Sequence, residues 1–403
     1  MKKLFLYAYF CCMPIFIYSQ KIDGLALTPP MGWNSWNFFK KDVTEDIIKE
    51  IVDALVATGL KDAGYEYVVI DDHWHGERDS LGFIQADAKK FPSGMKVLAD
   101  YVHSKGLKFG IYSDAGTMTC GGHPGSLGHE YQDALKYAEW GVDYLKYDWC
   151  NSDGLNAKSA YSLMRDALYK AGRPIVFSLC EWGVNKPWEW GADVGHMWRT
   201  TGDIWRNFDG DTIIWGFPSH GVLQILDKQD SMLRRYAGPD HWNDPDMLEV
   251  GNGMSANEDK AHFSLWAMLC APLMLGNDIR NMSSETIEIL TNKDVIAVNQ
   301  DKLGIQSLKL SSDENIEVWF KPLVNGDWAV CFLNRSKEDR TIHIDWKKYD
   351  FTDDISGKAT DFGKTVYNLK NLWTGKDEKT TQKTITQKIP SHDVLMYRLT
   401  RKK

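Results

Sequence analysis

The chain has 403 residues, of which 25% are charged and 43% are hydrophobic, and its formal net charge is −8. This length exceeds what one small core requires and suits a large α/β domain followed by a smaller one. The composition is typical of a folded globular protein, and the acidic balance argues against a nucleic-acid partner.

The first 19 residues differ from the rest of the chain. Lys2 and Lys3 precede an apolar run over residues 4–18, and Ser19 follows it. A basic start, a short apolar centre and a small residue at the end are typical of a secretory signal peptide. The run is short for a membrane-spanning helix, and no later stretch approaches the required length. We therefore expect an exported protein, periplasmic or secreted, without a membrane span; its oligomeric state is not indicated.

Between about residues 25 and 300, short apolar runs alternate with segments of helical periodicity, which predicts βα units around a parallel sheet. The predicted strands cover 25–33, 65–71, 108–113, 142–150, 174–180, 196–200, 241–244 and 272–276. Helices are predicted over 44–58, 95–104, 129–140, 160–171 and 278–301. Eight strands favour a closed (β/α)8 TIM barrel over an open sheet, and we assign this barrel to residues 20–302.

From about residue 303 the apolar period changes to two, which is the period of a β-strand. Residues 316–320 and 328–333 flank Asn325 and Gly326, a strong signal for a β-hairpin. Residues 342–346 and 394–399 also alternate. We therefore predict that residues 303–403 form a separate antiparallel β-domain.

The fourth predicted strand ends in ionisable residues. Side chains alternate along a strand, so Tyr144, Lys146 and Asp148 are expected on the same side. A lysine and an aspartate on an otherwise apolar strand are costly to bury without partners. One interpretation is a structural ion pair beneath a loop. The other is a catalytic carboxylate, Asp148, that stays ionised because Lys146 lowers its pKa.

Polar or aromatic residues follow seven of the eight predicted strands, where a barrel of this type carries its functional groups. In chain order they are Trp36; Asp71, Asp72, His73 and His75; Tyr112 and Asp114; Lys146 and Asp148; Cys180 and Trp182; Arg199 and Asp203; and Asp244, Asp246 and Met247. A single solvated loop carboxylate would need no explanation, but seven such strand ends predict one functional ring.

Three chemistries fit such a ring. The first is a metal hydrolase that uses His73 and His75 with the two aspartates before them, although these histidines are also ordinary loop residues. The second is a non-catalytic sugar-binding barrel, which needs aromatic side chains but no matched carboxylates. The third is glycoside hydrolysis by two carboxylates, for which Asp148 and Asp203 can face each other across the barrel mouth. Arg199, four residues before Asp203, suits a substrate hydroxyl or the second carboxylate.

From about residue 25 to 400, the chain closely resembles the α-galactosidases of glycoside hydrolase family 27, especially the plant-like members. The matching stretches are Met-Gly-Trp-Asn-Ser-Trp at 31–36, Asp-Asp at 71–72, Gly-Ile-Tyr-Ser-Asp at 110–114, Tyr-Leu-Lys-Tyr-Asp at 144–148, Ser-Leu-Cys-Glu-Trp-Gly at 178–183, Trp-Arg-Thr-Thr-Gly-Asp at 198–203 and Trp-Asn-Asp-Pro-Asp-Met at 242–247. The resemblance implies a (β/α)8 barrel with a C-terminal β-sandwich, a galactoside as substrate, and no metal or organic cofactor.

By analogy, the resemblance implies a retaining double displacement. Asp148 would attack the anomeric carbon, and Asp203 would protonate the leaving oxygen and then activate water. The two carboxyl groups should lie about 5–5.5 Å apart, the separation expected for retention. The resemblance also implies a sugar-binding set: Trp36, Asp71, Asp72, Tyr112, Lys146, Arg199 and Asp246, with Cys180, Trp182 and Met247 beside them.

The resemblance also bears on specificity. Asp71 and Asp72 would hold the O6 and O4 hydroxyls, and an axial O4 distinguishes galactose. Cys180 and Trp182 match the positions that face the C2 substituent, so a bulky tryptophan should exclude an N-acetyl group. Asp71 favours galactose over β-L-arabinopyranose, which lacks C6. A β-L-arabinopyranosidase on the same scaffold and a catalytically silent galactose-binding protein stay open as alternatives.

Removal of residues 1–19 leaves five of the seven cysteines, an odd number, so at least one thiol must be free or paired elsewhere. The resemblance pairs Cys120 with Cys150, which would tie the loop after strand three to the loop after strand four. A second family disulfide is missing because its two positions are Lys41 and His73 here. We expect this departure to affect the rigidity of two loops and not the catalytic roles.

Overall fold

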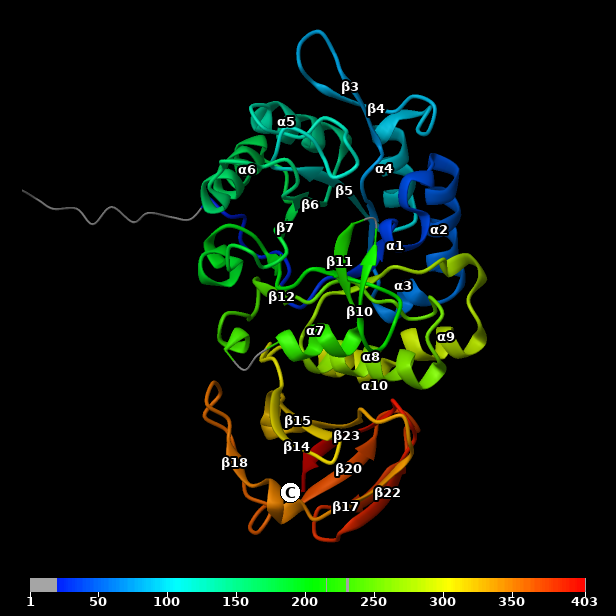
Figure 1. Ribbon diagram of the computed structural model, residues 1–403, viewed down its shortest axis with the longest axis vertical. Helices are drawn as coiled ribbons and strands as arrows, with labels where there is room; N and C mark the ends of the chain where they lie inside the picture. The colour runs from blue at the N-terminus through cyan, green and yellow to red at the C-terminus, as the bar shows by residue number, and fades with distance from the viewer. Residues whose placement is uncertain (1–19, 215, 230–231, 403) are drawn as a thin grey trace, which may run out of the picture.

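The computed structural model describes residues 20–214, 216–229 and 232–402, and the predicted signal peptide lies outside this range. Two parts follow each other along the chain (Figure 1). The first, coloured blue to yellow, is a ring of strands with helices around it, and the second, coloured yellow to red, is built from strands. Among the described residues, no helix combines the length and the apolar character that crossing a bilayer requires.

The parallel sheet closes into the predicted barrel. Its strands, in chain order, are β1 (Met31–Asn34), β2 (Tyr67–Ile70), β5 (Lys108–Asp114), β6 (Tyr144–Asp148), β7 (Val176–Cys180), β8 (Met197–Arg199), β12 (Trp242–Asp244) and β13 (Leu273–Leu275). Neighbours in the sheet are neighbours in this order, and β1 also pairs with β13. A parallel bridge between Leu248 and Leu275 closes the ring on the β12 side.

The first predicted strand was too long at its start. The strand begins at Met31, whereas residues 25–30 form no sheet pairing and include Pro29 and Pro30, which lack backbone N–H donors. Leu25 and Ala26 still pack against the buried cluster inside the barrel that includes Tyr67. Their apolar character therefore reflects packing and not strand formation.

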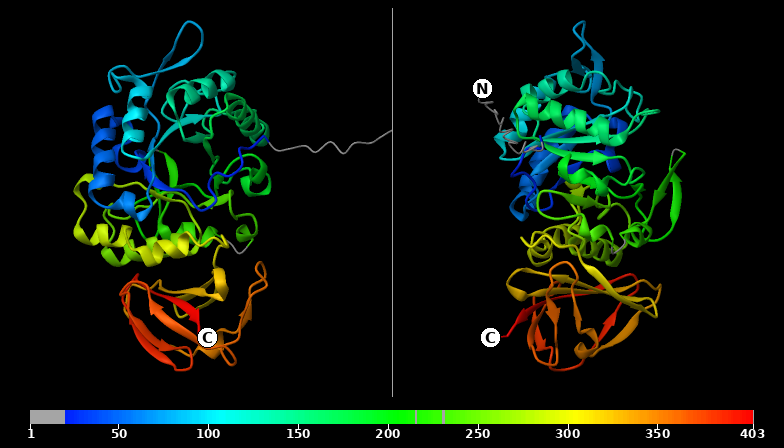
Figure 2. Two further views of the ribbon diagram at one scale, coloured as in Figure 1. Left: turned by 180° about the vertical axis from the view of Figure 1, so that it is seen from behind. Right: turned by 90° about the vertical axis from the view of Figure 1, so that its left-hand side faces the viewer.

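Helices surround the barrel (Figure 2). The longer ones are α2 (Glu45–Ala57), α4 (Gly94–Ser104), α5 (Glu130–Trp140), α6 (Ala157–Ala171) and α8 (Ala256–Met268); shorter ones are α1 (Trp36–Phe39), α3 (Leu60–Ala63) and α7 (Val222–Lys228). Helix α6 begins three residues earlier than predicted, because the Asn156 side chain accepts a hydrogen bond from the Ser159 backbone N–H and caps the first turn. Gly141 and Gly172 end α5 and α6 in the left-handed conformation.

The single helix predicted over 278–301 was wrong. The segment forms two short helices, α9 (Ser284–Leu290) and α10 (Lys293–Asn299), preceded by the 3-10 turn η5 (Ile279–Asn281). The Asn292 side chain accepts hydrogen bonds from the backbone N–H groups of Asp294 and Val295, which starts a new helix at Lys293. The apolar period continues across this break, so the sequence pattern gives no sign that Asn292 starts a second helix.

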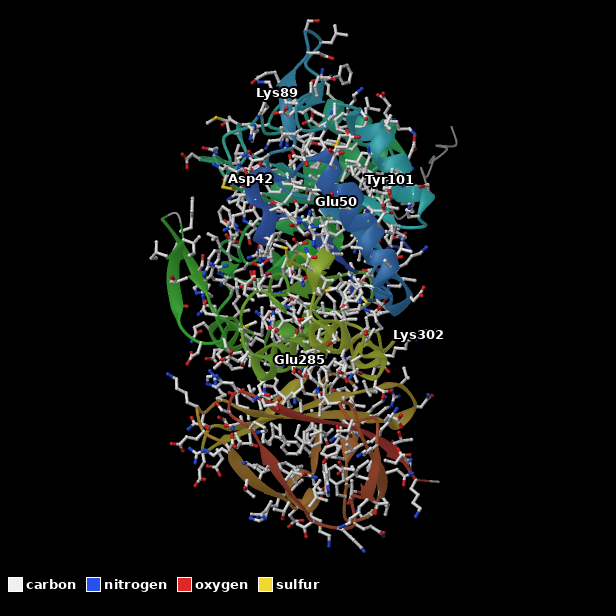
Figure 3. The ribbon with its side chains drawn as sticks, turned by 90° about the vertical axis from the view of Figure 1, so that its right-hand side faces the viewer. Asp42, Glu50, Lys89, Tyr101, Glu285 and Lys302 are labelled. Atoms are coloured by element: carbon white, nitrogen blue, oxygen red, sulfur yellow. A yellow bond between two sulfur atoms is a disulfide. The ribbon has the colours of Figure 1, made fainter. Side chains whose placement is uncertain are left out.

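Two antiparallel hairpins extend from the carboxyl ends of barrel strands and were not predicted. One pairs β3 (His75–Arg78) with β4 (Ile84–Ala86). The other pairs β10 (Asp211–Ile214) with β11 (Phe217–His220), and β11 also pairs in parallel with the two-residue strand β9 (Asp203–Ile204). The β10–β11 hairpin projects away from the barrel (Figures 2 and 3).

The C-terminal part is antiparallel, as predicted. One sheet has the order β14-β15-β16-β23-β20-β21, and β17 with β22 and β18 with β19 form smaller pairs. The bounds are β14 (Leu308–Asp313), β15 (Ile316–Pro322), β16 (Trp328–Asn334), β17 (Arg340–Ile344), β18 (Phe351–Thr352), β19 (Ala359–Thr360), β20 (Tyr367–Asn371), β21 (Asp377–Thr380), β22 (Ile385–Ile389) and β23 (Val394–Arg401). The predicted hairpin at Asn325 and Gly326 is confirmed, with both residues at positive φ.

The two parts are joined by buried contacts. Helix α8 packs against β15, β16 and β23. Arg234, before the seventh barrel strand, forms a buried ion pair with Asp353 of the C-terminal part. Lys321 of β15 donates to the Cys270 thiol at 2.8 Å, and both side chains are buried. The C-terminal domain therefore continues the barrel core on the side that carries α8.

Candidate active site

The carboxyl ends of the barrel strands bring the candidate residues around one cleft of about 660 Å³. Its lining includes Trp36, Asp71, Asp72, Tyr112, Lys146, Asp148, Trp182, Arg199, Asp203, Asp246 and Met247. Cys180 lines a smaller space of about 20 Å³ at the floor, which shares Lys146, Arg199, Asp246 and Met247 with the cleft. The ring of functional side chains predicted from the strand ends is therefore one continuous site.

The ion-pair partner of Lys146 differs from the prediction. Its ammonium lies 2.8 Å from an Asp71 carboxylate oxygen, so the pair joins β6 to the end of β2, across the intervening strand β5. The same Asp71 oxygen accepts a hydrogen bond from the Asn34 side-chain amide at 2.8 Å. Lys146 therefore holds a predicted sugar-binding carboxylate in place and acts on Asp148 at longer range.

The prediction that Lys146 lowers the pKa of Asp148 is confirmed, but Lys146 does not keep this pKa low, because burial outweighs it. Asp148 is only 5% exposed, and burial raises its pKa to about 7. Lys146 lowers this pKa, whereas the nearby carboxylates of Asp203 and Asp71 raise it. Asp148 thus lines the cleft as a buried carboxylate, which is poorly hydrated and correspondingly reactive.

Asp203 lies in a different setting. It begins β9, outside the barrel sheet, and its side chain is 48% exposed. One of its oxygens accepts a hydrogen bond from an Arg199 guanidinium nitrogen at 3.1 Å. The two carboxylates of the predicted pair therefore line one cleft from different sheets, one buried and one in contact with solvent.

Arg199 is buried and contacts several groups of the site. Its guanidinium lies 2.8 Å from the Asp246 carboxylate and donates at 2.9 Å to the Gly202 carbonyl. Asp246 also accepts from the Ile204 backbone N–H at 2.7 Å, directly after Asp203. Arg199 and Asp246 together fix the backbone that carries the exposed carboxylate.

Asp71 and Asp72 are held by backbone donors. Asp71 accepts from the Asp72 N–H at 2.9 Å, and Asp72 accepts from the His73 and Gly121 N–H groups at 2.7 Å each. His73 adopts a positive φ of 71°, an uncommon conformation that turns the chain sharply after this pair. These contacts orient both carboxylates before any ligand binds.

Two buried polar atoms at the site have no hydrogen-bond partner among the described residues: the Tyr112 hydroxyl and the Nε atom of Arg199. Burial holds the pKa of Tyr112 well above its usual range, so the hydroxyl keeps its proton and can donate. Leaving such groups unsatisfied is costly in a folded protein. A ligand that carries several hydroxyl groups would satisfy them.

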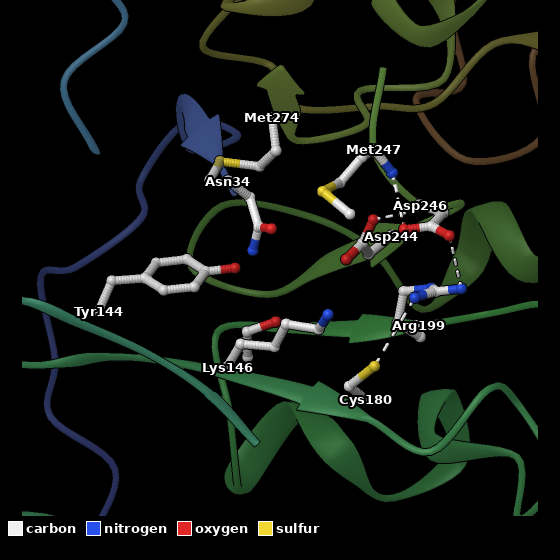
Figure 4. A pocket seen from close by; sticks show the side chains of 10 residues that line it. Asn34, Tyr144, Lys146, Cys180, Arg199, Asp244, Asp246, Met247 and Met274 are labelled. Carbon is white, nitrogen blue, oxygen red and sulfur yellow. Dashed lines mark hydrogen bonds and ion pairs between the residues drawn. The ribbon is translucent and has the colours of Figure 1, made fainter. Parts of the chain in front are cut away.

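The floor also carries five residues that the predicted sugar-binding set omits: Asn34, Tyr144, Ser178, Asp244 and Met274 (Figure 4). The strand pattern names Tyr144 and Asp244 but gives neither a role in sugar binding. Burial raises the pKa of Asp244 to about 6, whereas Arg199 lowers it. Asn34 could have been found, because it lies in the strand-one stretch that carries Trp36. Met274 carries no signal, since an apolar residue on the last strand gives no indication that it reaches the cleft.

The disulfide between Cys120 and Cys150 is confirmed, and Cys180, Cys270 and Cys331 are free and buried. Next to it, the Asp114 carboxylate accepts from the backbone N–H groups of Gly116 and Cys150. Burial raises the pKa of Asp114 to about 8. The disulfide and Asp114 together fix the loop that begins directly after Asp148.

The positions of the missing second disulfide carry other contacts. His73 stacks on the Trp36 indole with an interplanar angle of 4°, and its Nδ1 lies 2.8 Å from Nε2 of His123. Lys41 lines the cleft. The hydrogen-bonded histidine pair therefore joins the loop after β2 to the loop after β5 and does not bridge the two positions of the missing disulfide.

The metal-hydrolase alternative finds no support in the geometry. His73 bonds to His123, and His75 is fully buried against Trp74. Within residues 20–214, 216–229 and 232–402, one group of three ligand-type side chains gathers closely enough for a metal, namely Asp114 with Cys120 and Cys150. Its two sulfurs are bonded to each other, so they are not available as thiolates.

Comparison with known proteins gives consistent matches along the chain. Residues 28–301 match the family model described as alpha galactosidase A, and residues 313–399 match the alpha galactosidase C-terminal beta sandwich domain. The chain is 57% identical over 381 residues to an alpha-galactosidase A from Cellvibrio japonicus, and the match covers 94% of both chains.

Solved structures agree with these sequence matches. Alpha-galactosidase I from Mortierella vinacea superposes with a TM-score of 0.86 at 38% identity, covering 93% of this chain and 98% of that one. The Saccharomyces cerevisiae alpha-galactosidase, solved with raffinose, superposes with a TM-score of 0.87 at 32% identity, covering 96% and 100%. The likeness thus extends over both parts of the fold.

Proposed function

The chain belongs to the α-galactosidases of glycoside hydrolase family 27, and from this premise we propose how its cleft removes a terminal α-D-galactosyl residue. The activity is that of an α-galactosidase. Our proposal concerns the residues that perform it, the stereochemistry and the location of the enzyme. The observation that carries it is the pair of carboxylates, Asp148 and Asp203, which line one cleft and differ in burial.

In the first step, an Asp148 oxygen attacks the anomeric carbon while Asp203 gives its proton to the leaving oxygen. The bond to the leaving group breaks, and a β-galactosyl ester of Asp148 forms. In the second step, Asp203 takes a proton from water, which attacks the same carbon and releases Asp148. Two inversions give α-galactose, so the configuration is retained.

The setting of each carboxylate suits its role. Asp148 is buried, so its negative charge is poorly hydrated. That charge is lost when the covalent ester forms. Asp203 contacts solvent, so water can reach it in the second step and a leaving group can depart past it. Arg199 contacts both Asp203 and Asp246 and so restrains the position of the Asp203 carboxylate.

The sugar would be held by the residues that the cleft and its floor bring together: Trp36, Asp71, Asp72, Tyr112, Lys146, Cys180, Trp182, Arg199, Asp246 and Met247. The ordered carboxylates of Asp71 and Asp72 accept from hydroxyls, and the unpartnered Tyr112 hydroxyl donates to one. Trp182, which lines the cleft two residues after Cys180, would limit the space for a C2 substituent. This arrangement favours galactose over an N-acetylated sugar.

We also propose that the enzyme is exported, with residues 1–19 as its signal peptide. The disulfide between Cys120 and Cys150 supports this location, because such bonds persist in oxidising compartments. A mature protein would then consist of the barrel, residues 20–302, and the C-terminal domain, residues 303–403. Mass measurement of the protein recovered from outside the cytoplasm would give the cleavage site directly.

The test is a substrate panel of three p-nitrophenyl glycosides: α-D-galactopyranoside, β-L-arabinopyranoside and N-acetyl-α-D-galactosaminide. We expect turnover of the galactoside far above the other two. Asp148→Asn should abolish turnover and keep galactose binding, whereas Asp153→Asn, an exposed aspartate in the same loop, should change neither. Preference for the arabinopyranoside, or full activity of Asp148→Asn, would contradict the proposal.

A further inference from the structure

The Asp72 carboxylate is held by backbone N–H groups from two different loops. One oxygen accepts from His73 in the loop that follows β2, and the other accepts from Gly121 in the loop that follows β5, each at 2.7 Å. Because each oxygen depends on a different loop, a change in the separation of the loops would lengthen one bond or turn the carboxylate. The orientation of Asp72 therefore depends on what fixes the two loops relative to each other.

A hydrogen bond between two histidine rings spans the same two loops. Nδ1 of His73 lies 2.8 Å from Nε2 of His123, and the rings are nearly perpendicular, at 86°. In a neutral pair, one ring nitrogen carries a hydrogen and donates it to the lone pair of the other. His73 directly follows Asp72, and His123 lies two residues after Gly121. This bond therefore links the loops next to both donors of the carboxylate.

His123 is the firmly held member of the pair. Its backbone N–H donates to the Thr119 hydroxyl at 3.0 Å, and the Thr119 N–H donates to its carbonyl at 2.8 Å, which closes a tight turn. Cys120 of this turn is tied by the disulfide to the loop after β6. The ring of His123 stacks on His75, which is 2% exposed and itself stacks on Trp74. The turn is thus a rigid base for the loop after β2.

His73 is confined by several contacts. Its ring lies parallel to the Trp36 indole, at an angle of 4°, and both side chains line the cleft. A Cβ atom on Gly121 would lie 2.7 Å from the His73 ring, so the ring rests directly against the Gly121 backbone. The Lys90 ammonium donates to the His73 carbonyl at 3.1 Å. His123 itself does not line the cleft, so its substitution would act on a bound sugar through other residues.

We propose that His123 is a positioning residue for galactose binding. Its hydrogen bond to His73 fixes the separation of the two loops, and this separation orients the Asp72 carboxylate toward the sugar. The inference rests on the proposed function, in which Asp72 accepts a hydrogen bond from the O4 hydroxyl. Such a bond depends on distance and angle, so an Asp72 carboxylate that is less well oriented binds this hydroxyl less tightly.

The experiment measures kcat/KM on p-nitrophenyl α-D-galactopyranoside and on its 4-deoxy analogue, which lacks the hydroxyl assigned to Asp72. His123→Asn keeps a polar side chain at this half-buried position, but its amide is too short to replace Nε2. We expect kcat/KM to fall roughly three- to tenfold on the galactoside and less than about twofold on the analogue. Inhibition by galactose should weaken by the same factor as the loss on the galactoside. His123→Ser, which has no group that reaches His73, should give the same pattern.

Two further variants serve as rescue and control. His123→Gln ends in an amide that can occupy the position of Nε2, so its kcat/KM should return to within about twofold of the wild type. His129→Ser removes a hydrogen bond of the same kind in the same loop, between Nδ1 of His129 and the Gln132 side-chain oxygen at 2.7 Å. It should leave kcat/KM unchanged on both substrates.

The outcomes separate the inference from the proposed function. An equal loss on both substrates in His123→Asn and His123→Ser would indicate a general change in the cleft and would overturn the positioning of Asp72, as would unchanged kinetics. If His123→Gln were as impaired as His123→Asn, the role of the hydrogen bond would be overturned. A wild type that hydrolysed the 4-deoxy analogue as well as the galactoside would contradict the O4 assignment and, with it, the inference. If the wild type hydrolysed neither substrate, the proposed function itself would fail.

Discussion

The Lys146 ammonium lies 2.8 Å from the Asp71 carboxylate, across the barrel strand that separates β6 from β2. One cation thus neutralises the carboxylate that is proposed to bind O6 and lowers the pKa of Asp148 from a longer distance. Burial dominates, and the pKa of Asp148 is raised to about 7. Sugar binding and nucleophile ionisation are therefore linked through one side chain.

The variant Lys146→Met tests this link through the pH dependence of kcat/KM. Asp148 must be ionised to attack, so kcat/KM rises as the pH rises through the pKa of Asp148. Removing Lys146 removes an influence that lowers this pKa, so the acid limb should move to higher pH. We also expect kcat/KM to fall at least about a hundredfold, since the Asp71 carboxylate is left buried without its cation.

Lys108→Met is the matched control for this prediction. Lys108 begins the neighbouring strand β5 at the opposite end of the barrel, where it forms a half-exposed ion pair with Glu66. Its removal should leave the acid limb where it is. An acid limb that is unmoved in Lys146→Met, or moved to lower pH, would show that Lys146 does not act on the nucleophile.

Azide rescue distinguishes the two carboxylates. In Asp148→Ala, azide can occupy the vacated space and attack an activated α-galactoside once, which gives β-galactosyl azide. In Asp203→Ala, the galactosyl ester still forms, and azide displaces Asp148 from it to give α-galactosyl azide. Opposite anomers from the two variants are the expected result, read by NMR. The same anomer from both would contradict the assigned roles.

The local pattern of apolar runs ending in polar residues was sufficient to predict the eight strands and the ring of functional groups. It could not predict the partner of Lys146, because that partner depends on the three-dimensional register of β2 against β6. It also placed Asp203 at the end of β8, whereas Asp203 lies on β9 in a separate small sheet. Contacts between distant strands decide both features.

Helix α8 illustrates a second limit. Residues on all sides of its second half are buried, from Ala261 to Met268, because it is packed between the barrel and the C-terminal sheet. Such a helix has no polar face, so it lacks the amphipathic period by which helices are recognised. The β10–β11 hairpin was missed for another reason: it lies between the sixth and seventh predicted strands, in a stretch to which the sequence pattern assigned no element.

The disulfide between Cys120 and Cys150 should stabilise the enzyme more than it supports turnover. The two cysteines are 30 residues apart in sequence, and replacing both with serine should cost about 2–4 kcal/mol in the free energy of unfolding. Because Asp114 also holds the Cys150 backbone, we expect kcat to fall less than tenfold. Thermal unfolding with and without a reductant measures the effect. A reductant that lowers the melting temperature of the double variant as much as that of the wild type would contradict this.

Glu249 should make the fold less stable as the pH rises. Burial raises the pKa of Glu249 from 4.5 to about 8, so the folded state holds a proton that the unfolded state has lost. Stability therefore falls as the pH rises from about 4.5 and levels off above about 8. Glu249→Gln cannot ionise, and Asn252, which donates to the carboxylate, can turn its amide to match.

We expect Glu249→Gln to be more stable than the wild type at pH 8.5, by about 1 kcal/mol or more, and no more stable at pH 5. Denaturant unfolding at both pH values measures this difference. Glu288→Gln, on the exposed side of α9, should show no such dependence. If Glu249→Gln were more stable than the wild type at pH 5 but less stable at pH 8.5, the pH dependence would have the opposite sign. Protonation of buried Glu249 could then not explain it.

The most direct test of the whole account is the anomer of galactose that the enzyme releases first, followed by NMR during hydrolysis of p-nitrophenyl α-D-galactopyranoside. The double displacement through Asp148 predicts that α-galactose forms first and then mutarotates. Initial release of β-galactose would mean a single displacement by water, and Asp148 would not be the nucleophile.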